Sequence, residues 1–312
     1  MYGYENFQKV KAELEAKRLA AIALADSRNE MLRATIPEIK EIDAELVKTG
    51  LLIFKTACDG GDLSPIRERN LALGKRRREL LKENGYPEDY TEIKYSCPAC
   101  SDSGYADGKM CACMREALIK ENIKSSGIGH LIDKQSFDNF STSSYGEDSE
   151  FMESVLMIAK NYAYTFGPDS KNLVLSGKTG TGKTHISTAI ARVVIERGFD
   201  VLYDSAQNII SAFEDDKFRT GYNRQGSSAE KYLDCDLLII DDLGTEFTTQ
   251  FTVSCLYNLL NTRLNKGLAT VISTNLERQE LERKYDDRLF SRIFGTDSIQ
   301  LRFFGEDKRL NP

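Results

Sequence analysis

A glycine-rich loop between a strand and a helix constrains the fold of this chain more than any other feature. Residues 173–185 read Leu-Val-Leu-Ser-Gly-Lys-Thr-Gly-Thr-Gly-Lys-Thr-His, in which Gly177, Gly182, Lys183 and Thr184 match Gly-x-x-x-x-Gly-Lys-Ser/Thr in full. An apolar strand precedes the pattern and a helix follows it, which is the context that such a loop needs. From about residue 151 short β-branched runs alternate with helical segments, so we expect an α/β fold with a parallel sheet.

The same loop predicts where a nucleoside triphosphate binds. Its glycines let backbone N–H groups turn inward around phosphate oxygens, and the N-terminus of the following helix adds partial positive charge. Lys183 is expected to bridge the β- and γ-phosphates, and Thr184 to hold Mg²⁺. The expected nucleotide-binding residues are Gly177, Lys178, Thr179, Gly180, Thr181, Gly182, Lys183, Thr184, His185 and Asp241.

Two further apolar runs end in polar residues that suit this chemistry. Residues 237–240 lead into Asp241 and Asp242, and in open parallel sheets ligands bind beyond the carboxyl ends of the strands. We expect Asp241 to hold Mg²⁺ and Asp242 to orient the attacking water, with Glu246 as a second candidate for that role. Asn275 ends the other run and is expected to reach the γ-phosphate or the water.

Four of the seven cysteines fall within seventeen residues and predict a metal site. Cys97-Pro-Ala-Cys100 and Cys111-Ala-Cys113 flank a ten-residue segment with two glycines, so the two pairs can close a tetrahedron. Four thiolates leave no open position on Zn²⁺, which is typical of a structural site. An iron–sulfur cluster, a redox dithiol and plain reduced thiols stay open, because Cys-x-Cys is a less usual spacing.

The first 85 residues predict long amphipathic helices. Apolar residues recur at steps of three and four over residues 5–56, Pro37 predicts a break, and Gly60-Gly61 predicts a turn. Ser64 and Pro65 are expected to start the next helix as its N-cap and first residue. A coiled-coil hairpin and a small bundle both fit this pattern. The seven basic residues within 67–82 fit contact with nucleic acid or an acidic partner, or a solvated helix face.

The composition limits how the chain can meet DNA and membranes. The net charge of −6, from 42 basic and 48 acidic residues, argues against a protein that coats duplex DNA through bulk charge. No apolar run is long enough to span a bilayer, and the charged N-terminus lacks the apolar segment of a secretory signal. We therefore expect a cytoplasmic protein without a membrane partner.

The motifs as a set resemble those of AAA+ ATPases. They are most similar to the replicative helicase loaders of the DnaC/DnaI type, and the related IstB-type transposition helpers share much of them. The matching segments are GKTGTGKTH, LLIIDDLGTE, VISTNL and DDRLFSRIFG…FFGEDKR. The resemblance is strong over about residues 136–312, and the cysteine segment is similar to the zinc-binding N-terminal region of these loaders.

This resemblance implies a division of the chain and an architecture. It implies a AAA+ ATPase domain at 151–312, preceded by a helical partner-binding module at 1–95 and a four-cysteine zinc-binding module at 96–130. Ser, Gly and Asp are frequent just before the ATPase domain, which predicts a linker at 131–150. Only about ten residues follow the last expected strand, at 298–302, so a full helical lid does not fit. The nucleotide is then expected to be closed in by a neighbouring subunit.

The resemblance also implies roles for single residues. Asp241 and Asp242 match the Mg²⁺ and catalytic acids, and Asn275 matches the sensor asparagine. Arg292 stands where the family has an arginine finger for the neighbouring subunit, and Arg309 where it has a second sensor arginine; a surface arginine is the alternative for Arg292. Many relatives have Asp-Glu where this chain has Asp-Asp, so slow hydrolysis or a contribution from Glu246 is expected.

Basic and aromatic residues interleave between the second strand and the Asp-Asp strand. Aromatic rings can stack on bases while Lys and Arg follow the phosphates, although an ordinary exposed loop has the same composition. The expected contacts with single-stranded DNA are Lys217, Phe218, Arg219, Tyr222 and Arg224.

The sequence therefore predicts an ATP- and Mg²⁺-dependent loader of the replicative hexameric helicase onto single-stranded DNA, which self-assembles through its ATPase domain. Its acidic balance predicts weak, salt-sensitive DNA binding by a lone subunit, strengthened by ATP-driven assembly. The alternatives are a transposition helper that acts on duplex target DNA with a transposase, a small-molecule kinase, and an ATP-dependent switch with negligible turnover.

Overall fold

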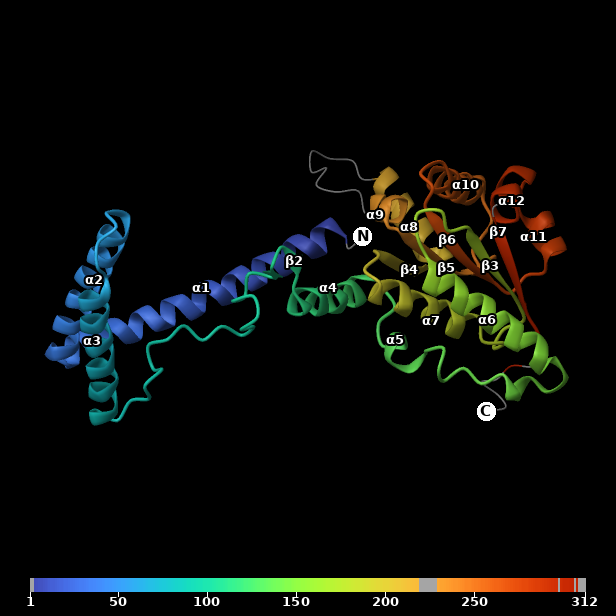
Figure 1. The fold of residues 1–312 in the computed structure, drawn as a ribbon. Helices are drawn as coiled ribbons and strands as arrows, with labels where there is room; N and C mark the ends of the chain where they lie inside the picture. Colours follow the sequence, from blue (N-terminus) through green and yellow to red (C-terminus); the bar gives the residue numbers. More distant parts are fainter. Residues whose placement is uncertain (1–2, 219–228, 297, 306, 308–312) are drawn as a thin grey trace. The chain divides into compact units, whose positions relative to one another are not determined.

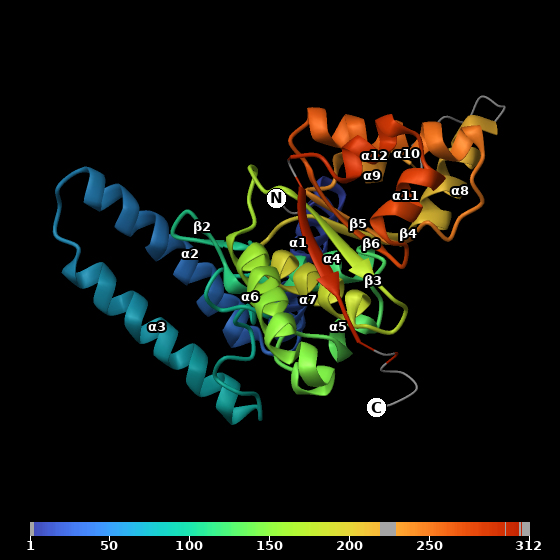
Figure 2. The same ribbon diagram turned by 90° about the vertical axis from the view of Figure 1, so that its right-hand side faces the viewer.

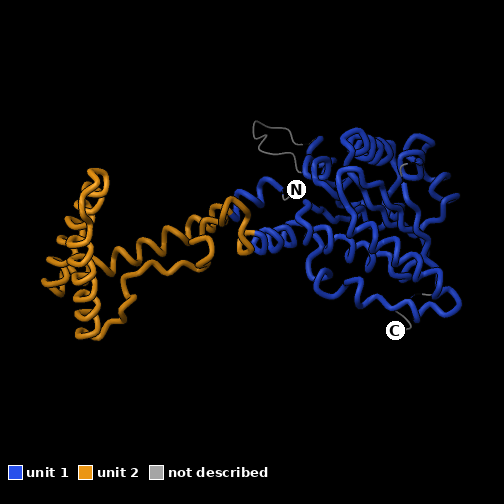
Figure 3. Tube along the Cα trace, in the orientation of Figure 1, with its two compact units in different colours: residues 1–10, 115–312 blue, residues 11–114 orange. Residues whose placement is uncertain are grey.

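The computed structural model describes residues 3–218, 229–296, 298–305 and 307. The chain divides into two compact units, one of residues 11–114 and one of residues 1–10 and 115–312 (Figure 3). This division falls within the segment that we expected to be one zinc-binding module, residues 96–130. None of the helices over the described residues is long and apolar enough to cross a membrane.

Three long helices dominate the unit of residues 11–114. They are α1 (Tyr4–Thr35), α2 (Pro37–Cys58) and α3 (Ser64–Glu83), as Figure 1 shows. The break at Pro37 is confirmed, because Ile36 is extended and Pro37 starts α2. Ser64 as N-cap is wrong by one position. Leu63 holds that place without a side-chain bond, and the Asp62 carboxylate accepts from the Ser64 N–H at 2.9 Å.

A small apolar core joins these helices at one end of the unit. Its buried members are Leu32 from α1, Ile39 and Ile42 from α2, and Leu80 and Leu81 from α3. Partly buried aromatic residues that follow α3, Tyr86 and Tyr90, pack against it. The small helical bundle that the sequence allowed is therefore confirmed at this end of the unit. A short hairpin of β1 (Tyr105–Ala106) and β2 (Lys109–Met110) follows in the same unit.

The other unit is built on a five-stranded parallel sheet. Its strands are β3 (Asn172–Gly177), β4 (Val201–Ser205), β5 (Leu237–Leu243), β6 (Ala269–Thr274) and β7 (Ser298–Phe303), in the order β4-β5-β6-β3-β7. All of the strand pairs are parallel, so the carboxyl ends of the strands share one edge. The central strands are apolar on both faces because helices cover both.

Consecutive strand residues enter two separate cores. Leu173 and Leu175 face a layer that includes α6 (Ser149–Thr165) and α7 (Lys183–Glu196), whereas Val174 faces the opposite layer. The first layer also receives α4 (Ala112–Ser125), α5 (Leu131–Lys134) and the 3₁₀ turn η1 (Ser143–Asp148). The second layer consists of α8 (Ala206–Phe218), α9 (Glu230–Asp234), α10 (Gln250–Asn265), α11 (Arg278–Lys284) and α12 (Asp287–Ile293). Figure 2 shows the two layers on either side of the sheet.

The segment expected to be a linker, residues 131–150, is instead part of this folded unit. Phe137, Phe140 and Tyr145 are buried in the same core as the strand residues. The serines and glycines between them form turns and local hydrogen bonds, so their composition does not make the segment a tether. At the other end, the described residues after β7 are Phe304, Gly305 and Asp307, and none of them is helical.

Candidate nucleotide site and cysteine cluster

The loop from Gly177 to Thr184 has the backbone that its glycines predict. Gly180 and Gly182 have φ angles of 75° and 92°, in the left-handed region that favours glycine. A Cβ on Gly182 would lie 2.7 Å from the Tyr145 hydroxyl oxygen and 2.8 Å from the Phe140 ring. A Cβ on Gly177 would lie 2.3 Å from the Phe303 carbonyl oxygen. The loop therefore fits tightly between β7 and the segment before α6.

Lys183 and Thr181 fold into the loop that they belong to. The Lys183 ammonium donates to the carbonyl oxygens of Gly177 at 2.6 Å and Lys178 at 2.7 Å, and its side chain is buried. The Thr181 hydroxyl donates to the Lys178 carbonyl at 2.8 Å, and the Thr181 carbonyl accepts from the Tyr145 hydroxyl at 2.9 Å. Lys183 is also the first residue of α7, so its ammonium and the helix N-terminus supply positive charge together.

A cavity of about 200 Å³ collects most of the predicted nucleotide-binding residues. Asp242 and Asn275, from the carboxyl ends of β5 and β6, face the loop across it, as parallel strands allow. Gln135 also lines this cavity. No sequence motif indicates Gln135, because it lies outside the phosphate loop and the two strand-end motifs. The lining residues are Gln135, Thr179, Gly180, Gly182, Lys183, Thr184, His185, Asp242 and Asn275.

The two aspartates at the end of β5 have different surroundings. Asp241 accepts from the Tyr203 hydroxyl at 2.5 Å and from the Ser273 hydroxyl. Burial, followed by the charge of Asp241, raises the pKa of Tyr203, so this phenol stays a donor. Asp242 has a φ of 54°, its N–H donates to the Ser273 hydroxyl at 3.0 Å, and its carboxylate accepts from the Asn275 amide at 3.2 Å. The sequence did not predict that the Tyr203 and Ser273 hydroxyls donate to Asp241.

Glu246 does not lie with this group, contrary to its expected role as a second catalytic acid. Its buried carboxylate accepts from the Gly244 N–H at 2.8 Å and from the Tyr285 hydroxyl, and lies 3.9 Å from the Lys284 ammonium. Lys284 is the last residue of α11, and Tyr285 follows this helix. Glu246 therefore joins the turn after β5 to α11, because the chain bends at the bulge between Ile240 and Leu243.

His185 is held by the segment that precedes the sheet. Its Nε2 lies 2.8 Å from the Ser136 carbonyl oxygen and 2.9 Å from Asn139 Oδ1, and its ring meets Phe140 edge-on at 5.2 Å. Both oxygens are acceptors, so Nε2 carries a proton and donates. Burial lowers the pKa of His185, although the Ser136 carbonyl opposes this shift. His185 is therefore a neutral imidazole fixed at the start of α7.

Arg292 lies apart from the cavity of its own subunit. Its Nε donates to Asn261 Oδ1 at 3.0 Å, and it lines a surface pocket with Asn172 and Ser298, the first residues of β3 and β7. The loop leaves β3 at the opposite end, across about 17 Å of strand at 3.3 Å per residue. Arg292 therefore lies at the end of β3 that is opposite to the loop of its own chain.

Several predicted residues lie outside the described part of the chain. These are Arg309, the DNA-contact candidates Arg219, Tyr222 and Arg224, and the side chain of Phe218. Lys217 is described, and its ammonium lies 4.7 Å from the centre of the Phe251 ring. Elsewhere in the same unit, Phe247 is 88% exposed in the turn after β5.

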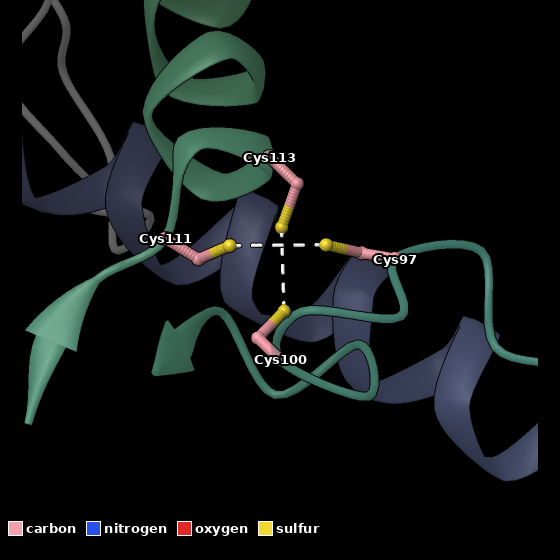
Figure 4. A group of neighbouring side chains, drawn as sticks. All are labelled: Cys97, Cys100, Cys111 and Cys113. Carbon is pink, nitrogen blue, oxygen red and sulfur yellow. Dashed lines mark hydrogen bonds between the residues drawn. The ribbon is translucent and has the colours of Figure 1, made fainter. Parts of the chain in front are cut away.

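The four clustered cysteines converge on one point (Figure 4). Their sulfur atoms all lie within 4.8 Å of one another, with Cys97 to Cys111 at 3.7 Å and Cys100 to Cys113 at 3.5 Å. Tetrahedral Zn²⁺ with Zn–S bonds of about 2.3 Å places sulfurs about 3.8 Å apart. The donor set and its spacing therefore fit zinc.

The loop around the cysteines is preorganised by a buried carboxylate. Asp102, which is 1% exposed, accepts from the N–H groups of Ser96 and Cys97 at 2.8 Å each. Asp107 and Gly108 both have positive φ in the turn of the β1–β2 hairpin, the Asp-Gly combination of a tight hairpin. The hairpin carries the chain back to Cys111, so the loop holds both cysteine pairs together.

The basic residues of α3 are largely engaged with acids of their own unit. Arg76 contacts Glu38 at 2.8 Å, and Arg69 contacts Glu45 at 2.6 Å. The half-buried Arg77 contacts Asp43 at 2.7 Å. These contacts support a helix-packing role, so we assign no nucleic-acid contact to residues 67–82.

Comparison with known proteins identifies a family that part of the chain matches. The model of the IstB-like ATP binding protein family matches residues 147–294. Residues 147–294 form an IstB-like ATP-binding domain. The replicative helicase loader DnaC of Escherichia coli (strain K12) is 27% identical over 206 residues, 62% of this chain and 80% of DnaC. An uncharacterized protein of the same strain, YdaV, is 26% identical over 201 residues, 63% of this chain and 77% of YdaV.

Two solved structures are similar to part of this chain. A crystal structure of the DnaC helicase loader has a TM-score of 0.46 at 18% identity, over 54% of this chain and 98% of that one. A crystal structure of DnaI has a TM-score of 0.46 at 21% identity, over 58% of this chain and 93% of that one. By sequence the chain is a homologue of the helicase loader DnaC, and its residues 147–294 match the IstB-like ATP binding protein family.

Proposed function

We propose that this protein is an ATP-dependent loader that delivers the replicative DNA helicase to single-stranded DNA, with ATP binding and hydrolysis timing delivery or release. The observation that carries the proposal is the cavity in which Lys183 and Thr184 face Asp242 and Asn275, in a chain homologous to a helicase loader. DnaC is named a replicative helicase loader, and 80% of its length is covered.

The residues of the cavity fit ATP and Mg²⁺. The loop N–H groups and Lys183 would bind the phosphates, while Thr184 and Asp241 would hold Mg²⁺, which neutralises the charge that develops on the phosphates. The Tyr203 and Ser273 hydroxyls donate to the Asp241 carboxylate and hold it in one orientation. Asp242 would orient the water, because the Asn275 amide holds its carboxylate at the cavity.

Hydrolysis would require a second subunit. Arg292 is directed to a surface pocket at the far end of β3 from the loop, so it is available to a neighbour's nucleotide and not to its own. The test mixes inactive Lys183→Ala and Arg292→Ala proteins. Activity above the sum of the two means that Arg292 acts between subunits. A mixture no more active than its components removes that role.

The unit of residues 11–114 would bind zinc and the helicase. Its cysteine geometry fits zinc, and the end of α2 leaves large apolar side chains in solvent that its own core does not use. The exposed side chains are Val47, Leu51, Leu52 and Phe54 of α2, and Leu71 of α3. A protein partner would cover these side chains, and the proposed partner is the helicase.

Single-stranded DNA would meet the ATPase domain near the end of α8. Lys217 over the Phe251 ring and the exposed Phe247 combine a cation with aromatic faces, as single-strand binding requires. Reversing the charges of Lys217, Arg219 and Arg224 together is expected to weaken binding to a labelled oligonucleotide at low salt. Unchanged affinity would remove this surface from the proposal.

The family match keeps one alternative open. Residues 147–294 match the IstB-like model, so a transposition helper that acts on duplex target DNA would share the same domain. Two measurements on the full-length protein decide between them: capture of partners from the source cell, and ATPase activity with single-stranded or duplex DNA. Recovery of the hexameric helicase with single-strand stimulation supports the loader. Recovery of a transposase with duplex stimulation supports the helper.

A further inference from the structure

The Tyr203 side chain crosses from the edge strand of the sheet to Asp241, the proposed Mg²⁺ ligand. In the parallel pair of β4 and β5, Tyr203 lies opposite Ile239, and Ser205 lies opposite Asp241. Because side chains alternate along a strand, Tyr203 and Asp241 share one face as diagonal neighbours, within reach of an aromatic side chain. The Tyr203 hydroxyl covers this distance and donates to Asp241 Oδ2 at 2.5 Å.

Two hydroxyls fix the plane of the Asp241 carboxylate. Tyr203 on β4 donates to Oδ2, and Ser273 on β6 donates to Oδ1. The strands β4 and β6 flank β5 in the sheet, so the two donors come from opposite sides. A carboxylate offers about four acceptor positions, so two remain for a metal ion or its water ligands. Rotation of this carboxylate would break both hydrogen bonds.

The backbone of Tyr203 is fixed by the turn that follows α4. The Tyr203 N–H donates to the Ser126 carbonyl oxygen at 2.7 Å. Gly127 has a φ of 81°, and a Cβ at this position would lie 2.4 Å from the Tyr203 carbonyl oxygen. The turn therefore packs directly against the edge of the sheet, and it presents the phenol to Asp241 from a fixed backbone.

Tyr203 also meets the helix that carries the other proposed Mg²⁺ ligand, Thr184. Ser187, a fully buried residue of α7, donates to the Thr184 carbonyl oxygen at 3.0 Å. The Ser187 hydroxyl also lies within reach of the Tyr203 phenol, and this contact offsets part of the rise in the Tyr203 pKa that burial causes. The phenol is therefore linked to α7 and to β5, the two elements that carry the proposed metal ligands.

We propose that Tyr203 is a positioning residue that sets the affinity of the nucleotide site for Mg²⁺ by holding Asp241 in its ligating orientation. This inference rests on the proposed function, because it requires that the cavity binds ATP and that Asp241 holds the metal. The hydrogen-bond partners of a ligating carboxylate orient it, and their loss lowers metal affinity roughly 10–100-fold. Without the Tyr203 hydroxyl, Asp241 would be held at Oδ1 by Ser273 and free to rotate about that bond.

Tyr203→Phe removes the hydroxyl and keeps the ring and the backbone contacts. The test compares the dissociation constants of the full-length protein for a non-hydrolysable ATP analogue in excess Mg²⁺ and in EDTA. In the unaltered protein, Mg²⁺ should strengthen binding. In Tyr203→Phe this strengthening should fall roughly tenfold, whereas the affinity in EDTA should stay unchanged because the phosphate loop is untouched. Loss of a purely structural residue would change both dissociation constants alike.

Tyr232→Phe is the matched control. The Tyr232 hydroxyl also donates to a carboxylate, that of Asp204, at 2.7 Å. Asp204 directly follows Tyr203 on β4, so it faces the opposite side of the sheet, where Tyr232 packs in the second core. Among the described residues, the lining of the nucleotide cavity includes neither Tyr232 nor Asp204. The control should therefore leave the effect of Mg²⁺ unchanged.

The outcomes separate this inference from the proposed function. Equal strengthening by Mg²⁺ in Tyr203→Phe and in the unaltered protein overturns the inference alone. A loss of affinity that is the same in Mg²⁺ and in EDTA also overturns it, because Tyr203 then supports the fold and not the metal. If the unaltered protein does not bind the nucleotide, or binds it without any effect of Mg²⁺, the proposed function fails as well.

A fluorine label tests the same contact with the hydroxyl in place, so it decides the question even if Tyr203→Phe impairs folding. The resonance of 3-fluorotyrosine at position 203 should shift when Mg²⁺ is added to the nucleotide complex. The same label at position 232 should not respond. An unchanged resonance at position 203, in a protein whose nucleotide binding Mg²⁺ still strengthens, overturns the inference.

Discussion

At the residue scale, Asp242 stands in a backbone conformation that few side chains tolerate. Its φ of 54° follows from the bulge at the end of β5, which turns the carboxylate toward Asn275 and the cavity. Asp and Asn accept the left-handed region better than other residues with a Cβ. The identity of this residue is therefore constrained by backbone as well as by chemistry.

Asp242→Asn separates these two constraints. The amide tolerates the same φ, so the fold and ATP binding should be kept, while hydrolysis should fall roughly 10²–10⁴-fold because the water loses its acceptor. Thermal unfolding and single-turnover hydrolysis with Mg²⁺ measure the two effects. A variant that folds normally and hydrolyses ATP at the original rate would mean that another group orients the water.

Glu246 should behave as a structural residue. Glu246→Ala leaves the Gly244 N–H and the Tyr285 hydroxyl without their acceptor in a buried place, which should lower the stability of the ATPase domain by about 2–4 kcal/mol. The exposed Glu282→Ala is the control, with a change within about 0.5 kcal/mol. Urea unfolding measures both. Lost hydrolysis at unchanged stability would return Glu246 to the catalytic site.

Motifs predicted the site residues where backbone and chemistry are tied together. The loop at 177–184 was predictable because its glycines are needed for both its conformation and its ligand. The direction of the Glu246 side chain was not predictable, since its spacing from Asp242 does not reveal the register shift between Ile240 and Leu243. Gln135 was missed because a single glutamine in a polar segment has no signature; only the folded turn brings it to the cavity.

At the scale of elements, helix boundaries followed the sequence where proline and glycine set them. Pro37 and Gly60-Gly61 delimit α2 as predicted. The segment 131–150 was mistaken for a linker, because its Ser and Gly content outweighed three widely spaced aromatic residues. Those residues are buried, and the turns between them wrap the phosphate loop. The Ser and Gly content of such a segment indicates its turns, but it does not indicate the buried aromatic residues that hold the segment in the core.

Two leucines of α3 separate folding from partner binding. Leu81→Ala removes a fully buried side chain and should destabilise the helical core by about 2–5 kcal/mol. Hydrogen exchange over α2 and α3 should quicken accordingly. Leu71→Ala, at a side chain 71% exposed, should leave exchange unchanged and reduce capture of the partner. Equal partner capture by Leu71→Ala and the unaltered protein would count against this surface.

Zinc should stabilise only the cysteine segment. Metal analysis of the protein made under reducing conditions should give about one zinc per chain, and Cys97→Ser should lower this value, whereas the exposed Cys58→Ser should not. Chelation should quicken hydrogen exchange around residues 96–114 and leave ATP binding intact. The absence of zinc, or loss of ATP binding on chelation, would contradict a structural site confined to this segment.

At the scale of the whole molecule, the acidic balance and the proposed activity are compatible. A net charge of −6 opposes tight DNA binding by a single chain. Binding should strengthen when subunits assemble around ATP and place several such surfaces along one strand. In the proposed assembly, Arg292 lies away from its own cavity and would be available to the nucleotide of a neighbouring chain.

In the proposed function, ATP at this loop drives helicase delivery. The most direct measurement is unwinding by the replicative helicase of the source cell on DNA coated with single-strand-binding protein, with and without this protein and ATP. We predict that the protein with ATP starts unwinding and that Lys183→Ala, which loses the loop ammonium, does not. Equal unwinding with Lys183→Ala, or none with the unaltered protein although it binds the helicase and hydrolyses ATP, would contradict the claim.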